Sequence, residues 1–250
     1  MRLVKIDQLT IGAGRPKMIV PIVGQTKEEI LAVAKEASES VCDLVEWRID
    51  HYEDVTVDGA VSELSKVVKE TAGKPLLVTF RSFKEGGELD IPDDQYFNIY
   101  HDIITNGQLD LLDIELFMDK DQVVELVAAC HDKNIQVVMC NHDFDATPSK
   151  EEIVSRLTQM EEKGADICKI AVMPKNASDV LVLLDATQER YQQADVPLIT
   201  MSMGSLGMVS RLAGEAFGSA ATFGSLGKAS APGQMPVEDL AISLERLQLT

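Results

Sequence analysis

The chain of 250 residues is long enough for one α/β barrel or two small domains. It is 45% apolar and 26% charged, as ordinary globular proteins are, and its 41 acidic and 23 basic residues give a net charge of −18. This charge argues against nucleic acid and anionic membranes as partners, because both attract a basic surface.

Short apolar segments alternate with amphipathic ones along the chain. The predicted strands cover residues 18–23, 44–49, 75–81, 109–116, 136–142, 166–172, 197–202 and 221–223. The predicted helices cover residues 27–38, 59–71, 94–105, 119–133, 149–163, 178–193, 209–217 and 237–247. Strands separated by helices pair in parallel through right-handed crossovers. Eight such units predict a (β/α)8 TIM barrel, built as a single domain from residues 1–250.

The ends of the predicted elements support this fold. Thr26 and Ser149 each precede a Glu by three residues, the spacing of a capping box at a helix start. Residues 1–11 are left over and predict a short N-terminal hairpin that plugs one end of the barrel. An open doubly wound sheet would favour a GxGxxG motif after its first strand. Residues 12–17 lack the third glycine and precede the strand, so the barrel is preferred.

The cysteines and the N-terminus indicate a cytoplasmic protein. Cys42, Cys130, Cys140 and Cys168 are far apart and form no CxxC pair, so we expect buried free thiols and no metal site. The N-terminus has no apolar signal segment, and no run of about 18 apolar residues could span a bilayer.

Lys169 interrupts the apolar strand 166–172. Burial should lower the pKa of its amine from about 10.4, and a neutral amine can attack a carbonyl to form a Schiff base. The structural alternative is a lysine that pairs with a carboxylate inside the barrel or extends to its edge. His142 ends the neighbouring predicted strand, where it could transfer protons or serve as a structural histidine.

Other strands also carry charged residues near their ends. Glu46 and Arg48 share one face of a strand, as do Asp113 and Glu115, and Arg81 ends a strand. Each pair alone could be a structural salt bridge. Since a purely structural interior would contain Val, Ile and Leu, the joint pattern predicts a polar catalytic pocket at the C-terminal ends of the strands.

Two similar glycine-rich loops, residues 204–210 and 224–230, follow the last two predicted strands, where barrels often bind anions. Arg211 could hold a carboxylate through two hydrogen bonds, and residues 230–234 have the composition of a lid. An amine, a proton carrier and arginines in one pocket predict imine chemistry on a small anionic carbonyl compound.

The sequence resembles the type I 3-dehydroquinate dehydratases. The segments that carry this resemblance are residues 46–50, 79–81 with 85–87, 141–144, 169–174, 201–204 with 210–211, and 230–234. The resemblance implies dehydration of 3-dehydroquinate to 3-dehydroshikimate, a carbon–oxygen lyase reaction of the shikimate pathway. It also implies no metal or cofactor and a homodimer.

The resemblance further implies a role for each matching residue. Lys169 would form the imine with the C3 ketone, His142 would move protons, and Glu85 would orient or tune His142. The implied substrate-binding residues are Glu46, Trp47, Arg48, Arg81, Met201, Met203, Arg211, Phe223, Ser230 and Gln234. In this set, Arg211, Ser230 and Gln234 would hold the carboxylate.

Two other functions remain open from the residues alone. A class I Schiff-base aldolase shares the barrel lysine but breaks a C–C bond, usually on phosphorylated sugars. A non-catalytic ligand-binding barrel would leave Lys169 unreactive, with an ordinary pKa.

Overall fold

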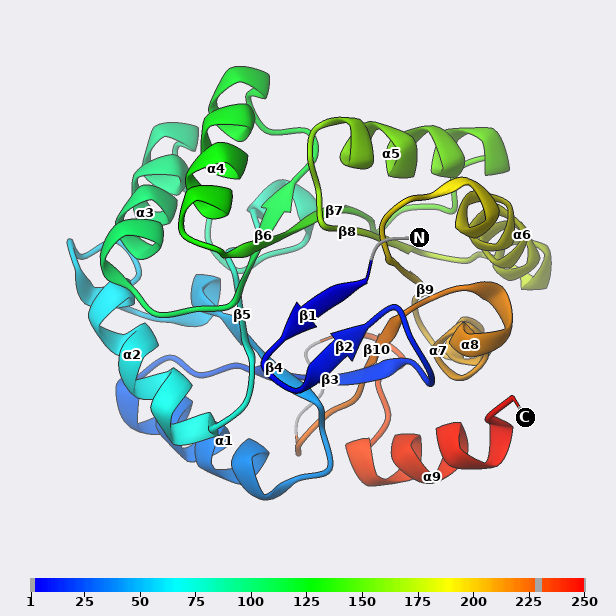
Figure 1. The fold of residues 1–250 in the computed structure, drawn as a ribbon, viewed down its shortest axis with the longest axis horizontal. Coiled ribbons are helices and arrows are strands. Elements are labelled where there is room, and N and C mark those ends of the chain that lie inside the picture. Colours follow the sequence, from blue (N-terminus) through cyan, green and yellow to red (C-terminus); the bar gives the residue numbers. More distant parts are fainter. Residues whose placement is uncertain (1–2, 228–230, 250) are drawn as a thin grey trace.

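The computed structural model describes residues 3–227 and 231–249. Within them, one sheet of eight parallel strands runs in the order β10-β3-β4-β5-β6-β7-β8-β9 (Figure 1). The strands are β3 (Lys17–Ile22), β4 (Leu44–Arg48), β5 (Leu76–Thr79), β6 (Leu111–Glu115), β7 (Gln136–Asp143), β8 (Ile167–Val172), β9 (Leu198–Ser202) and β10 (Ala221–Phe223). A bridge between Leu198 and Ser219 joins β9 to the segment before β10, so the barrel is nearly closed and the predicted fold is confirmed.

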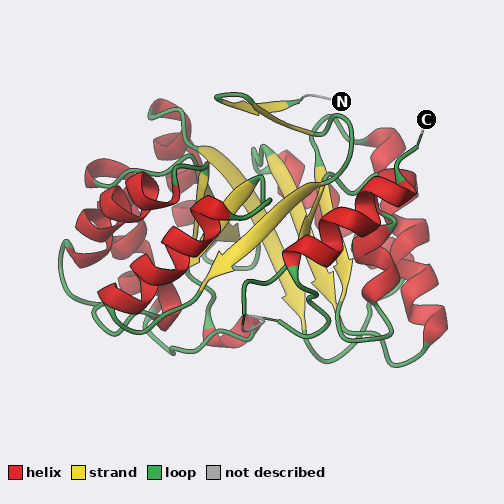
Figure 2. Cartoon of the chain, turned by 90° about the horizontal axis from the view of Figure 1, so that it is seen from below, coloured by secondary structure: helices red, strands yellow, loops and turns green. Residues whose placement is uncertain are grey.

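Helices surround the sheet on its outer side (Figures 1 and 2). The α-helices are α1 (Lys27–Glu39), α2 (Ala60–Ala72), α3 (Asp93–Asn106), α4 (Lys120–Asp132), α5 (Lys150–Glu162), α6 (Ala177–Gln193), α7 (Met208–Leu212), α8 (Gly214–Phe217) and α9 (Val237–Leu247). Two short 3-10 helices, η1 (Ile49–His51) and η2 (Phe83–Glu85), follow β4 and β5. Both lie at the end of the barrel where the strands finish.

The single helix predicted over residues 209–217 is wrong, because the chain forms α7 and α8 instead. The break falls at Ala213, directly before Gly214, the first residue of α8. A Cβ at Gly214 would lie 2.9 Å from the backbone oxygen of Ser219, so only glycine permits this close approach.

The two predicted helix starts differ in detail. Thr26 forms the complete capping box with Glu29. Ser149 accepts a hydrogen bond from the backbone of Glu152, but the Glu152 carboxylate accepts one from Arg156. Glu152 is thus available to fix an arginine on the next turn of α5.

The N-terminal hairpin closes one end of the barrel, as predicted. Strands β1 (Val4–Ile6) and β2 (Leu9–Ile11) pair antiparallel and lie across the end where the barrel strands begin (Figure 2). Three of their side chains are buried against apolar residues at the beginnings of the barrel strands: Val4, Ile6 and Ile11. The hairpin does not cover the opposite end of the barrel, where the strands finish and a functional site is expected.

Alternate residues of each strand face the helices or the barrel interior. On β4 this alternation sends Glu46 inward and Trp47 outward, where the indole packs 6.1 Å from the ring of Tyr52 in the outer core. The assignment of Trp47 to substrate binding is therefore wrong. All four cysteines are buried free thiols, as predicted. In the described part of the chain, no helix is both long and apolar enough to cross a membrane.

Candidate active site

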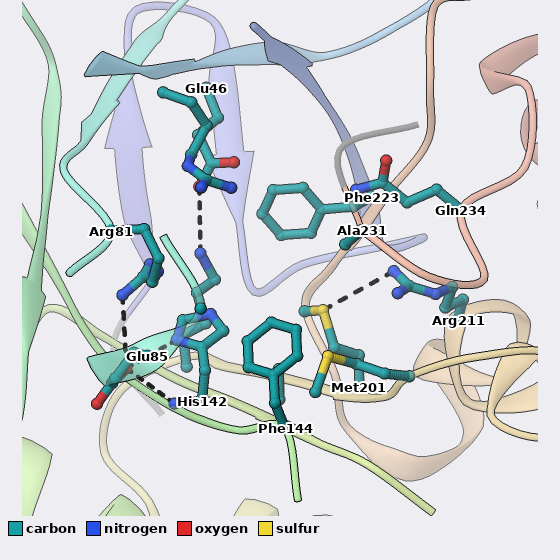
Figure 3. Close-up of a pocket in the computed structure, with 15 residues that line it drawn as sticks. Glu46, Arg81, Glu85, His142, Phe144, Met201, Arg211, Phe223, Ala231 and Gln234 are labelled. Atoms are coloured by element: carbon teal, nitrogen blue, oxygen red, sulfur yellow. Dashed lines mark hydrogen bonds and ion pairs between the residues drawn. The ribbon is translucent and has the colours of Figure 1, made fainter. Parts of the chain in front are cut away.

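A cavity opens at the C-terminal ends of the strands, and charged and apolar side chains line it together (Figure 3). Its lining consists of Glu46, Arg48, Arg81, Glu85, Gly86, His142, Phe144, Lys169, Ala171, Met201, Met203, Arg211, Phe223, Ala231 and Gln234. Every predicted site residue is among them except Trp47 and Ser230, and Ser230 lies outside the described residues.

Lys169 lies buried inside the barrel between two carboxylates. Its Nζ donates to Asp113 Oδ2 over 3.0 Å and to Glu46 Oε1 over 3.2 Å, and lies 4.9 Å from the ring centre of Phe223. Burial lowers the pKa of Lys169, but the charges of Asp113 and Glu46 outweigh it and raise the pKa above its ordinary value. The expected lowering of this pKa is wrong, because the sequence did not place the two carboxylates beside the amine.

Arg81 links the carboxylates of the interior. Its Nη2 donates to Asp113 Oδ1 over 2.7 Å, and its Nη1 donates to Glu115 Oε1 over 2.8 Å. Burial alone would raise the pKa of Asp113, but the charges of Arg81 and Lys169 lower it to about 2. Asp113 is therefore an anion shared by two cations.

His142 and Glu85 form a hydrogen-bonded pair at the rim of the cavity (Figure 3). The ring Nδ1 and the backbone N–H of His142 each lie 2.9 Å from Glu85 Oε2. Burial and the cations of Arg81 and Lys169 lower the pKa of His142 well below its ordinary value. Burial and the charge of Glu115 raise the pKa of Glu85 to about 8.

Arg211 lies across the cavity from this pair (Figure 3). Its guanidinium contacts Met201 Sδ at 3.8 Å and donates to the carbonyl of Pro232 over 3.1 Å. Its Nε has no partner among the described residues. Burial lowers the pKa of Arg211 to about 10, and no carboxylate of the described residues lies beside this cation to offset the burial. Such a group suits an anionic ligand.

Comparisons with known proteins agree with this geometry. Residues 18–249 match the family model for type I 3-dehydroquinase. The chain belongs to this family. It is 53% identical over 242 residues to the 3-dehydroquinate dehydratase of Enterococcus faecalis, with 96% of each protein covered. It is 50% identical over 255 residues to that of Listeria monocytogenes, with 99% of this chain and 98% of the relative covered.

A solved type I 3-dehydroquinase from Clostridium difficile, which carries covalently modified comenic acid, has the same fold. Its TM-score to this chain is 0.95, at 48% identity over 98% of each chain. A structure from Geobacillus kaustophilus also has a TM-score of 0.95, at 37% identity, and covers 98% of this chain and 96% of that one.

In this type I 3-dehydroquinase, Arg48 is held by a neighbour on η1. Its Nε and Nη2 donate to the two oxygens of Asp50 over 2.8 and 2.7 Å. Asp50 also accepts from the backbone N–H groups of Arg81 and Glu88, both over 3.3 Å. Arg48 thus reaches the cavity already paired, unlike Arg211.

Several functional contacts were missed from the sequence. Phe144 lines the cavity two residues after His142, and its ring would clash with any Cβ at Gly86. Asp113 was placed on the interior face but was not assigned to the lysine, and its spacing from Glu115 was the available signal. Asn141, next to His142, donates to Glu85 Oε1 over 2.9 Å.

Donor atoms of Glu85, Cys140 and His142 lie within 4.8 Å of one another, a spacing that could hold a metal ion. However, Arg81 Nη1 lies 3.0 Å from the Cys140 sulfur and 3.5 Å from Glu85. The guanidinium already supplies the positive charge at this place, so a second cation is disfavoured.

Proposed function

We propose that this protein dehydrates 3-dehydroquinate to 3-dehydroshikimate, a hydro-lyase reaction of the shikimate pathway toward aromatic amino acids. Membership of the type I family supports the reaction. The observation that carries it is the buried Lys169 amine, placed between Asp113 and Glu46 in a cavity that also holds a histidine and an arginine with no carboxylate partner among the described residues.

The first stage is imine formation. Lys169 passes its extra proton to a neighbouring group and attacks the C3 carbonyl carbon with its nitrogen lone pair. The carbonyl oxygen leaves as water, and a positively charged iminium joins C3 to Nζ. Because Asp113 and Glu46 already favour a cation at Nζ, the same carboxylates stabilise the iminium.

The second stage is loss of the C1 hydroxyl. The iminium draws electrons from the neighbouring C2–H bond, and His142 takes the C2 proton, giving an enamine. The enamine electrons then form the C1–C2 double bond while the C1–O bond breaks, and His142 returns its proton to the departing oxygen. Water hydrolyses the imine, so the sum is one 3-dehydroquinate converted to one 3-dehydroshikimate and one water.

The remaining lining residues would hold the substrate. Arg211, with Gln234 and Ser230 of the lid, would bind the carboxylate, while Glu46, Arg48 and Arg81 would contact the ring hydroxyls. Met201, Met203 and Phe223 would form apolar walls.

Borohydride reduction in the presence of 3-dehydroquinate tests this function. The reduced imine should add the mass of the ligand to the peptide that contains Lys169, and Lys169→Met should take up no label while it keeps its fold. A conjugated enone product, followed by its absorbance, distinguishes dehydration from the C–C cleavage of an aldolase. Label on another lysine, or no enone, would refute the proposal.

We also propose that the protein is a cytoplasmic homodimer that binds neither nucleic acid nor membranes. The family resemblance supports the dimer, and the net charge of −18 supports the absence of polyanionic partners. Light scattering coupled to gel filtration should give twice the chain mass, and a monomer at micromolar concentration would exclude the dimer.

A further inference from the structure

Hydrogen bonds connect the outside of the barrel to the catalytic pair. Arg156 Nη1, on α5, donates to Asn141 Oδ1 over 2.8 Å. The Nδ2 of Asn141 donates to Glu85 Oε1 over 2.9 Å, and the other oxygen of Glu85 lies 2.9 Å from His142 Nδ1 (Figure 3). Asn141 is buried, so its amide is oriented by these two partners.

Arg156 is itself held on several sides. Its Nε donates to Glu152 Oε1 over 2.7 Å, and its guanidinium carbon lies 5.5 Å from the ring centre of Phe117. Asp143 lies 3.8 Å from Nη1. Only 16% of the Arg156 side chain is exposed, so the guanidinium has little freedom to leave Asn141.

The direction of these hydrogen bonds determines which groups carry protons. A guanidinium only donates, so Asn141 must turn its oxygen toward Arg156 and its NH2 toward Glu85. A donor facing Glu85 favours the carboxylate over the carboxylic acid. The carboxylate in turn accepts the Nδ1 proton of His142, which leaves the lone pair on Nε2 to take a proton from a ligand.

We infer that Arg156 and Asn141 are positioning residues that favour the form of the Glu85–His142 pair with an unprotonated Nε2. Nothing in the sequence pattern of the strands links Arg156 to the cavity, since it lies on an outer helix. The protonation state is a property of the protein alone, and only its use in catalysis rests on the proposed function.

Several other charged or titratable groups face the pair. They are Arg48 on β4, Arg81 after β5, Glu115 on β6, Cys140 on β7 and Lys169 on β8. None of them hydrogen-bonds to Arg156. Removal of the Arg156 guanidinium therefore leaves their own contacts with the pair in place, although Asp143 loses an ion-pair partner. Asn141→Leu keeps the Arg156 charge, so a shift shared by both variants reports on the route through Asn141.

The titration of the His142 ring tests the inference without substrate. Below a pH of about 8, the raised pKa of Glu85, the pair binds one extra proton. The ring and the carboxyl group share this proton across Nδ1, and Nε2 carries a hydrogen in that state. In Arg156→Met, the Asn141 amide is free to turn its oxygen to Glu85 and favour the acid. The midpoint for Nε2, followed by 15N shifts of labelled histidine, should rise by about one pH unit, the expected effect of losing one hydrogen bond to a charged group.

Matched variants separate this effect from a general loosening of α5. Arg190→Met removes another buried guanidinium that holds α5, through Glu161, and should leave the Nε2 midpoint unchanged. Arg156→Lys still donates to Asn141 and should restore most of the parent midpoint. Asn141→Leu, which removes the bridging amide, should raise the midpoint in the same direction and serves if Arg156→Met does not fold.

The outcomes distinguish this inference from the proposed function. An unchanged midpoint in both Arg156→Met and Asn141→Leu, or an equal shift in Arg190→Met, would overturn the positioning role. A parent protein that forms no borohydride adduct on Lys169 would refute the proposed function and leave the ring titration to be judged separately. If the positioning role and the proposed function both hold, the acid limb of kcat/KM in Arg156→Met should move to higher pH together with the Nε2 midpoint.

Discussion

The carboxylate of Asp113 lies 3.0 Å from the amine of Lys169, and both groups are buried inside the barrel. Arg81 binds the other oxygen of the same carboxylate. Two cations thus share this anion, and together with Glu46 it holds the lysine in its protonated form even though the amine is removed from water.

Asp113→Asn should therefore change both reactivity and stability. Loss of the anion leaves Glu46 as the single carboxylate bonded to Lys169, so the amine pKa should fall and the borohydride-trapping rate should reach its half-maximum at lower pH. The buried cations lose a partner, which should lower the free energy of unfolding by about 3 kcal/mol. Trapping rates across pH and urea denaturation measure these effects, and an unchanged pH midpoint would contradict the first.

His142→Ala should lose a factor of about 10²–10⁴ in turnover, the usual effect of removing a general acid–base group. Imine formation does not need its proton transfer at C2, so borohydride should still trap substrate on Lys169. His131→Ala is the control, because His131 pairs with Asp166 away from the cavity. Near-parental turnover in His142→Ala would mean that another group removes the C2 proton.

The guanidinium of Arg211, which has no carboxylate partner among the described residues, should determine the Michaelis constant. Arg211→Lys keeps a charge but loses the planar fork, so KM should rise markedly, and Arg211→Ala should raise it further. Gln234→Ala should weaken binding less, since Gln234 belongs to the segment 230–234 that the sequence predicts to be a lid. Steady-state kinetics of the three variants tests this order. If Arg211→Ala binds substrate as tightly as the parent, Arg48 or Arg81 holds the carboxylate.

The acid limb of kcat/KM should lie near pH 8. Because the pKa of Glu85 is raised to about 8, the pair keeps its extra proton below that pH, and activity should fall about tenfold for each further unit of pH. In Glu85→Gln only the ring titrates, and its pKa is lowered, so the limb should move below about 6.5. A parental profile that is flat between about pH 6 and 8 would contradict this assignment.

The hairpin should contribute to stability and leave catalysis unaffected. Ile11→Ala removes a fully buried side chain from the closed end of the barrel and should lower the free energy of unfolding by about 3 kcal/mol. Thr10→Ala, at the half-buried neighbouring residue, should lower the free energy of unfolding much less. Since the cavity lies at the opposite end, kcat/KM should match the parent in both variants.

The barrel could be predicted from sequence because its signal is local. Each strand is a short apolar run between helix caps and glycines, and the charged residues that interrupt these runs mark the cavity. Strand ends were less certain: the predicted strand 75–81 is β5 (Leu76–Thr79), since Phe80 and Arg81 already leave the ladder for η2. Family motifs supplied the role of Glu85, which lies on a 3-10 helix without any strand pattern.

The missed features depend on partners that are distant in sequence. Lys169 meets Glu46 and Asp113 only through the closure of the sheet, so its raised pKa could not be read from the apolar strand around it. The contact between Arg156 and Asn141 joins a helix to a strand end. Arg156 lies on an amphipathic helix, where most charged residues face solvent, so the sequence pattern did not indicate this contact.

The pairing of β10 with β3 brings Ala221 beside Lys17, so the first and last barrel strands are hydrogen-bonded to each other. During synthesis on the ribosome, β3 therefore has an open edge until nearly the whole chain has emerged. An unpaired strand edge is a template for aggregation. Prematurely terminated chains that end before Ala221 would keep this edge exposed, which makes them substrates for chaperones or proteases rather than smaller active enzymes.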